Sequence, residues 1–254
     1  MRLSRRSLYS VVQQIIWFIA CLGLLLSALA LSWHSIARAD YLYPLWYQQL
    51  SIDEHINTFA PQNNRGKFGL ELLPPEEHFA LFREIRKAVH HHGQGLESIS
   101  YSTPSGEQQL LLHADEVVHL QDVARLITLL EQVSEWLMPM TIILVLLLSM
   151  TQVAVNWRRQ ALILFLLVAL TIAAVLLIGP THVFYTLHIW IFPPENPWFF
   201  YYQDSLMTTL MKAPQLFGAI AIAIALGGLL WLAALLALLW LYQRQLKVWR
   251  TLKH

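Results

Sequence analysis

The stretch ALILFLLVALTIAAVLLI, residues 161–178, contains no charged side chain. About 20 apolar residues cross the hydrocarbon core of a bilayer, so this length and composition are typical of a transmembrane helix. The whole chain supports that interpretation, because 56% of its residues are hydrophobic and only 13% are charged. Soluble domains carry about 25% charged residues.

Three further charge-free runs flank this stretch, and each is long enough to span a bilayer. The fold class we predict is therefore a membrane α-helical protein with four transmembrane helices. The long segment between the first and second spans should form a mixed α/β extracytoplasmic cap. The predicted spans are residues 12–33, 136–155, 161–179 and 216–242.

Lys and Arg near the span ends predict the orientation, since these residues are enriched in cytoplasmic loops. They occur in the N-terminal residues 1–11, in the turn 156–160 and in the tail 243–254, which we expect in the cytoplasm. The cap, residues 34–135, and the aromatic loop 180–215 should then lie outside. This predicts a multi-pass membrane protein with both termini cytoplasmic.

The first run has a competing interpretation as a cleaved signal peptide, because Ala37-Arg38-Ala39 resembles a cleavage site. The run is longer than the usual apolar core of about 7–15 residues, which favours an uncleaved anchor. The lone Cys21 lies inside this run, where a thiolate is costly, so we expect it to serve as a small apolar packing residue.

The cap contains several local signals of secondary structure. Acids early and bases late, with an apolar stripe between them, are typical of a helix. Alternating residues around a Pro-Ser-Gly turn favour a hairpin. The predicted elements are an exposed loop at 61–69, a helix at 74–89, a hairpin of 99–103 with 109–113, and a helix at 115–136 leading into the second span. Residues 42–50 remain open between a strand and an interfacial stretch.

Two groups of histidines need an interpretation. His90-His91-His92 resembles a metal tract, but consecutive helical residues point in different directions, which favours a solvated helix end. His119 lies on a predicted helix with Asp115, Glu116 and Asp122 one turn away on either side. Such carboxylates can orient an imidazole and raise its pKa, although an acidic solvated face with an incidental histidine is the competing interpretation.

The loop 180–215 is unusually aromatic and also carries His188. Aromatic residues belong at the membrane–water interface, so an ordinary aromatic belt is one interpretation. The other is a pocket for a ligand with acyl chains and a polar centre, because a belt does not require histidine. Candidate lining residues are Tyr185, Trp190, Phe192, Trp198 and Asp204.

Two segments of this chain resemble the signature segments of the lipoprotein intramolecular transacylase family. They are Glu116–Val123 (EVVHLQDV) and Leu187–Phe192 (LHIWIF), the latter followed by Trp198-Phe199 and Asp204–Leu206. The resemblance includes the order of four spans with a cap after the first. It is specific in the two histidine segments and loose in the cap, which is longer here than in the Gram-positive members.

The resemblance implies an enzyme that acts on a bacterial lipoprotein whose N-terminal cysteine carries a diacylglyceryl group. Such an acyltransferase moves the sn-2 acyl chain to the cysteine's own amine and leaves a lyso-form lipoprotein. It implies a protein of the bacterial inner membrane with His119 and His188 as the catalytic pair. Within this pair we expect His119, oriented by Asp115, Glu116 or Asp122, to act as the base. His188 would then donate to the oxyanion and help protonate the departing oxygen, and the opposite division of roles is the alternative. Membrane lipid is the other expected partner, at a site on the outer face.

The sequence also indicates which partners are not expected, and two other functions are alternatives. We expect no cofactor, metal, nucleotide or nucleic acid, because the chain has no P-loop, no dinucleotide motif and no basic face. One rival is a metal-dependent membrane hydrolase that uses His113, Asp115 and His119, although their spacing is not a standard ligand set. The other is a non-catalytic membrane subunit that binds lipid or protein.

Overall fold

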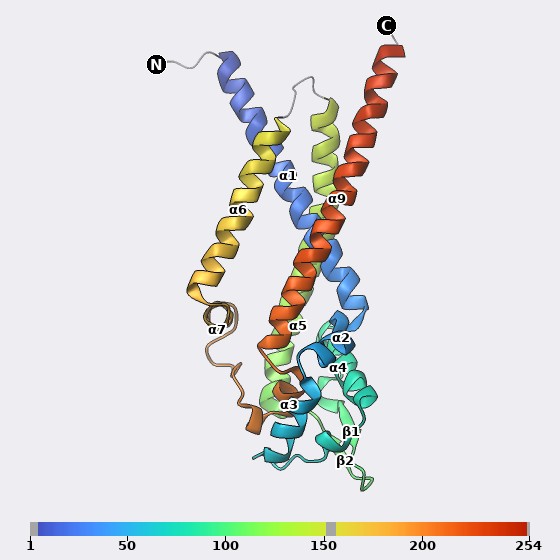
Figure 1. The fold of residues 1–254 in the computed structure, drawn as a ribbon, viewed down its shortest axis with the longest axis vertical. Helices are drawn as coiled ribbons and strands as arrows, with labels where there is room; N and C mark the ends of the chain where they lie inside the picture. Colours follow the sequence, from blue (N-terminus) through green and yellow to red (C-terminus); the bar gives the residue numbers. More distant parts are fainter. Residues whose placement is uncertain (1–4, 151–155, 253–254) are drawn as a thin grey trace. The chain divides into compact units, whose positions relative to one another are not determined.

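The computed structural model describes residues 5–150 and 156–252 and is built mainly from helices (Figure 1). Four helices are long and apolar enough to cross a membrane, which confirms the four predicted apolar helices. They are α1 (Arg5–Arg38), α5 (Ala114–Met150), α6 (Trp157–Ile178) and α9 (Gln215–Leu252). The expected end of the second span, residues 151–155, and the basic residues Arg2 and Lys253 lie outside the described residues.

Shorter elements make up the rest of the described chain. The helices are α2 (Tyr43–Gln49), α3 (Ile52–Phe59), α4 (Pro75–Val89), α7 (Pro180–Ile191) and α8 (Leu206–Met211), and the strands are β1 (Ser100–Ser102) and β2 (Gln108–Leu110). The chain divides into two compact units. Unit 1 comprises residues 1–34, 132–177 and 224–254, and unit 2 comprises residues 35–131 and 178–223.

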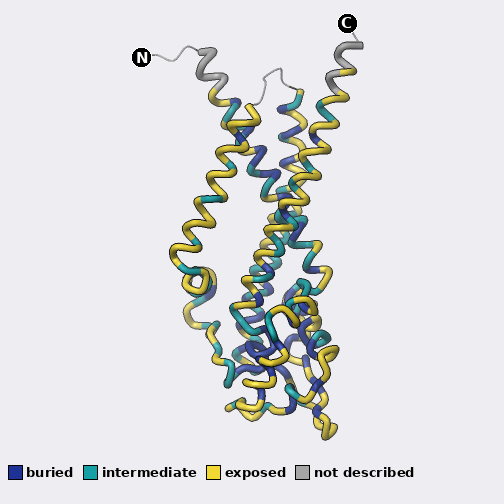
Figure 2. The backbone as a smooth tube through the Cα atoms, viewed as in Figure 1, coloured by how far each residue is buried: buried dark blue, intermediate teal, exposed yellow. Residues whose placement is uncertain are grey.

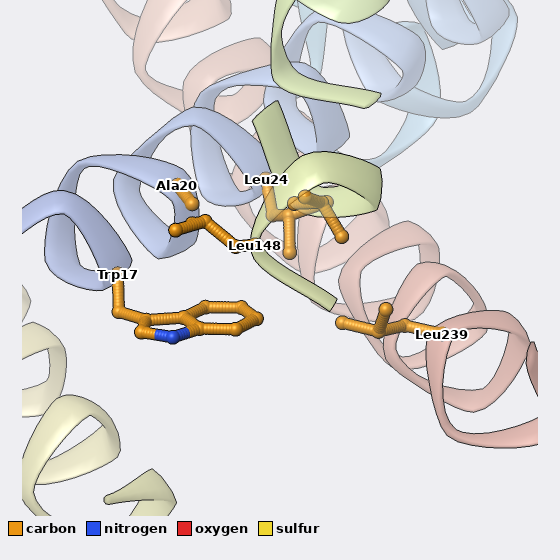
Figure 3. Close-up of a cluster of buried hydrophobic side chains, with 6 residues drawn as sticks. Trp17, Ala20, Leu24, Leu148 and Leu239 are labelled. Atoms are coloured by element: carbon orange, nitrogen blue, oxygen red, sulfur yellow. The ribbon is translucent and has the colours of Figure 1, made fainter. Parts of the chain in front are cut away.

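Unit 1 is held together by a small apolar cluster contributed by three helices (Figure 3). Its buried members are Trp17, Ala20, Leu24, Val145, Leu148 and Leu239. Glycines allow close approach elsewhere in this unit: a Cβ on Gly228 would lie 2.6 Å from Leu29 Cδ2, and one on Gly23 would lie 2.6 Å from Thr141 Oγ1. Such small residues are typical of packing between membrane helices.

Helix α6 differs from its neighbours because it is exposed along almost its whole length (Figure 2). Its buried residue is Gln160, whose side-chain amide donates to the backbone carbonyl of Gln14 at 3.0 Å. Trp157 adds an edge-on contact with Trp17, with ring centroids 5.6 Å apart. Helix α6 is therefore fixed to the rest of unit 1 near its N-terminal end, and its apolar surface is largely exposed.

Unit 2 confirms two of the elements predicted for the cap. Helix α4 begins at Pro75 and ends at Val89, and it buries the predicted stripe that includes Phe82 and Ile85. The hairpin is also present, shorter than expected, with Tyr101 paired to Gln109 in antiparallel register. Residues 61–69 are mostly exposed, as predicted for a loop rich in turn formers.

The segment 42–50 is a helix, so the strand alternative was wrong. Helix α2 buries Tyr43 and Tyr47, which lie four residues apart and therefore share one helical face. The Tyr43 ring stacks on Phe82 at 4.1 Å, and its hydroxyl donates to the Leu210 carbonyl at 2.7 Å. Tertiary packing has overridden the strand propensity of aromatic residues here.

The histidine tract is not simply a solvated helix end. His90 is half-buried, with Nε2 2.9 Å from the Tyr41 hydroxyl and Nδ1 2.7 Å from a carboxylate oxygen of Glu131. His91 is exposed, as expected for a solvated position. The expectation therefore was wrong for His90, whose side chain joins α4 to α5 within unit 2.

Candidate active site

Unit 2 brings together the two histidines that the sequence singled out. His119 lies in the second turn of α5 and is 8% exposed. His188 lies near the end of α7, a helix with no buried residue. The two ring centroids are 6.2 Å apart with a tilt of 34°. Segments far apart in the sequence therefore place two imidazoles side by side.

The His188 ring is fixed by its own helix. Its Nδ1 lies 2.8 Å from the backbone carbonyl oxygen of Phe184, which can only accept, so Nδ1 carries the proton. A neutral ring then presents Nε2 as a free lone pair, the form that a general base requires. Burial lowers the pKa of His188, and the hydrogen bond to Phe184 partly offsets that effect.

Aromatic rings surround His119 instead of hydrogen-bond partners. The Phe192 ring lies 5.0 Å from His119, and the Phe200 ring lies 6.0 Å away. Phe192 also lies 5.2 Å from His188 and is itself 8% exposed. The Phe192 ring therefore contacts both imidazoles. Among the described residues, none hydrogen-bonds to the His119 ring, so its nitrogens are available to a ligand.

The three predicted orienting carboxylates have different partners. Asp115 pairs with Arg65 at 2.8 Å. Glu116 is fully buried and accepts the backbone N–H of His113, which is the capping-box bond at the start of α5. Asp122 is 6% exposed, and its charge acts on His119. Only Asp122 therefore lies where it influences the histidine pair, while the other two stabilise the beginning of the helix.

The predicted lining residues separate into two groups. Trp198 lies 5.1 Å from His188 and 5.8 Å from Tyr185, so these residues and Phe192 form an aromatic wall around the pair. Trp190, by contrast, is 77% exposed. Asp204 accepts from the side-chain amide of Asn64 at 3.4 Å, and it contacts neither histidine in the described part of the chain.

The residues proposed as a metal set in the hydrolase alternative are not assembled. His113 and His119 both lie near the start of α5, but both carboxylate oxygens of Asp115 accept from the guanidinium of Arg65. Burial, followed by the nearby charges of Lys67 and Arg65, lowers the pKa of His113 to about 4. Within residues 5–150 and 156–252, no three His, Cys, Asp or Glu side chains are grouped to hold an ion.

Sequence reasoning missed three residues of this site. Phe184 supplies both the carbonyl that fixes His188 and a ring 4.0 Å from it. Its position four residues earlier would have indicated this contact if the segment had been recognised as helical. Phe200 and Asn196 follow α7 in irregular chain, where no periodicity indicates which way a side chain points.

One comparison with known proteins identifies a family. The family model "Lipoprotein intramolecular transacylase Lit" matches residues 16–213, which include both histidines and the whole of unit 2 up to Ala213. No curated protein and no solved structure matches the chain significantly. Because the model covers more than half of the sequence, the chain belongs to the lipoprotein intramolecular transacylase family.

Proposed function

We propose that this protein moves the sn-2 acyl chain of a diacylglyceryl-cysteine lipoprotein to the amine of the same cysteine. The observation that carries the proposal is the pair of imidazoles, 6.2 Å apart between centroids, inside an aromatic wall. Two basic nitrogens at that separation can serve an attacking amine and a departing oxygen in one reaction. The family membership supports transacylation over hydrolysis.

The reaction balances within one substrate molecule. The amine nitrogen attacks the ester carbonyl carbon and forms an amide bond, while the bond from that carbon to the glyceryl oxygen breaks. The proton lost by the amine ends on the glyceryl oxygen, which becomes a hydroxyl. The products are an N-acyl group and a lyso-glyceryl thioether. An ester gives way to a more stable amide, so no nucleotide is required.

The tautomer of His188 favours a particular division of roles. A neutral His188 has its Nδ1 proton committed to Phe184, so its Nε2 accepts the amine proton as a general base. His119, which has no fixed partner, then donates a hydrogen bond to the carbonyl oxyanion, and the imidazolium of His188 passes the amine proton on to the departing glyceryl oxygen. This reverses the sequence-based expectation that His119 is the base, because the bond to the Phe184 carbonyl leaves Nε2 of His188 as an accepting nitrogen.

Holding the ester and the amine together should be the largest contribution to rate. A floppy diacylglyceryl group loses much conformational freedom when its ends meet, and pre-ordering them is worth several orders of magnitude. The wall formed by Tyr185, Phe192 and Trp198 suits this task. It would contact acyl chains and exclude water that would otherwise hydrolyse the ester.

The proposed setting is the outer face of a bacterial inner membrane. The basic turn 156–160 and the basic tail 243–254 support cytoplasmic positions for those segments and for both termini. With four spans, the cap 34–135 and the aromatic loop 180–215 are then extracytoplasmic. Lipoproteins carry their lipid on that side, so the substrate meets the histidine pair where the two segments meet.

Tandem mass spectrometry of a lipoprotein N-terminus, from cells with and without this protein, tests the proposal. The product is an isomer of the substrate, so its intact mass is unchanged and fragmentation must locate the acyl chain. We expect the acyl chain on the peptide nitrogen and loss of reactivity toward an amine-labelling reagent.

Two variants complete this experiment. The double variant His119→Ala, His188→Ala should leave the amine free. His91→Ala, which changes an exposed histidine of the same unit, should behave as the wild type. A lipoprotein that keeps its free amine in cells making the wild-type protein would overturn the proposed reaction.

A further inference from the structure

A turn that follows α7 is bonded to the helix that carries His119. Residues Pro193–Asn196 form this turn, closed by a bond of 3.1 Å from the Asn196 backbone N–H to the Pro193 carbonyl. The Asn196 side-chain amide donates to Asp122 Oδ2 at 2.6 Å. Asp122 lies one helical turn after His119 on α5. One side-chain hydrogen bond therefore joins the segment that follows His188 to helix α5, which carries His119.

Asp122 needs this donor because it is a buried carboxylate. Its side chain is 5% exposed, and Oδ1 accepts from Arg125 at 2.7 Å. Asn196 satisfies the second oxygen. A buried carboxylate oxygen without a partner is costly, so the turn has a strong preference for the position in which the amide reaches it.

The chain between Asn196 and His188 is short and partly fixed. Phe192 donates its backbone N–H to the His188 carbonyl at 3.0 Å, and its ring contacts both imidazoles. Helix α7 itself has no buried residue, so its own packing restrains it little. The position of His188 therefore depends on what holds the end of α7.

We infer that Asn196 is a positioning residue, which uses its bond to Asp122 to hold His188 at working distance from His119. The inference rests on the proposed function, because working distance has meaning only for that reaction. In this inference, Asp122 on α5 is the acceptor of the hydrogen bond from the turn that contains Asn196. Displacing a reacting group by about 1 Å can cost a hundredfold in rate.

Substitutions of Asn196 test the inference with a diacylglyceryl lipopeptide in detergent or nanodiscs. Asn196→Ala should lower kcat about ten- to a hundredfold at a temperature where the variant is folded, with KM little changed. Its melting temperature should also fall, because a buried oxygen of Asp122 loses its donor. Asn196→Asp should lower kcat further, because two carboxylates then face each other. The exchanged pair Asn196→Asp, Asp122→Asn restores a donor and an acceptor and should recover most of kcat.

Two controls separate positioning from general damage. Glu195→Ala changes an exposed residue of the same turn and should leave kcat unchanged. In a Cys21→Ala background, the pair His119→Cys, His188→Cys should be joined by a short bifunctional thiol reagent. Adding Asn196→Ala should lower the cross-linking yield.

The outcomes distinguish this inference from the reaction it serves. Wild-type turnover and cross-linking in Asn196→Ala would overturn the positioning role and leave the transacylase proposal intact. No amine acylation by the wild type would overturn the reaction, while the cross-linking yield would still decide whether Asn196 holds the two segments together. A failure of the exchanged pair to recover kcat, with normal folding, would also contradict the inference.

Discussion

The two compact units bury different kinds of side chain. Where burial is described, every buried Asp, Glu or His belongs to unit 2: His55, His78, Glu116, His119 and Asp122. Unit 1 buries apolar side chains and a few neutral polar ones, such as Ser27 and Gln160. Buried titratable groups are expensive and concentrate at functional sites. The comparison therefore supports the proposal that unit 1 anchors the protein and unit 2 carries the chemistry.

The largest effect should come from the histidines of unit 2. Removing a general acid or base costs about 10²–10⁴ in rate. We expect His188→Ala to lose more turnover than His119→Ala, because the base activates the nucleophile. Amine loss on a diacylglyceryl lipopeptide, followed over time, measures both. Equal activity of both variants and wild type would break the assignment of chemistry to unit 2.

The pH profile should sharpen the assignment of His188 as the base. Burial lowers its pKa, so the ring stays neutral and able to accept a proton below the usual range near 6.5. The substrate amine has a pKa of about 7.7–8.0 and must also be neutral. Between pH 6 and 7 the rate should thus rise about tenfold per unit with the amine, then level off above pH 8. A rate that rises with pH along the titration of a histidine whose pKa is above about 6.5 would contradict the assignment of His188 as the base.

Phe192 should have a smaller effect than either histidine. It contacts both imidazoles and donates no proton, so Phe192→Ala should lower kcat about tenfold by loosening their spacing. It should also destabilise the protein, because removing a buried ring leaves a cavity. Phe192→Leu keeps most of the volume and serves as the matched control. Thermal melting measured beside turnover separates the two contributions.

The smallest effect should come from unit 1 and should spare activity. In Gly228→Ala the new Cβ would lie 2.6 Å from Leu29 Cδ2, so Leu29 must shift, at a cost of about 1 kcal/mol. The melting temperature should fall by about 2–4 °C with kcat unchanged. Gly218→Ala on the same helix meets no atom within 4 Å and should not lower it. A loss of turnover in Gly228→Ala would show that unit 1 affects activity as well as stability.

Sequence patterns predicted the elements whose signal is local. Long apolar runs indicated the four helices, and charge and spacing at 74–89 indicated α4. Patterns failed where distant contacts decide the conformation. Helix α2 depends on Phe82, and α7 lies in a segment whose three prolines and aromatic residues gave no clear helical period.

The candidate site was predictable only in part. The two histidines were found by resemblance, and their proximity could not be derived from spacing on separate segments. The flanking acids looked equivalent in sequence, yet Asp115 pairs with Arg65 and Glu116 caps a helix. The Glu116 bond is local, but the partners of Asp115 and Asp122 lie 50 and 74 residues away, so helical spacing alone could not separate these two.

The exposure of α6 has a consequence for how this sequence can vary. Its described contacts involve Trp157 and Gln160, while the apolar window of this helix is 0% buried. Selection on most of its positions then acts on hydropathy and length and not on shape. Leu, Ile, Val and Phe should exchange freely along α6 in a recombined or engineered chain, whereas α1 must keep its small residues in register with their partners.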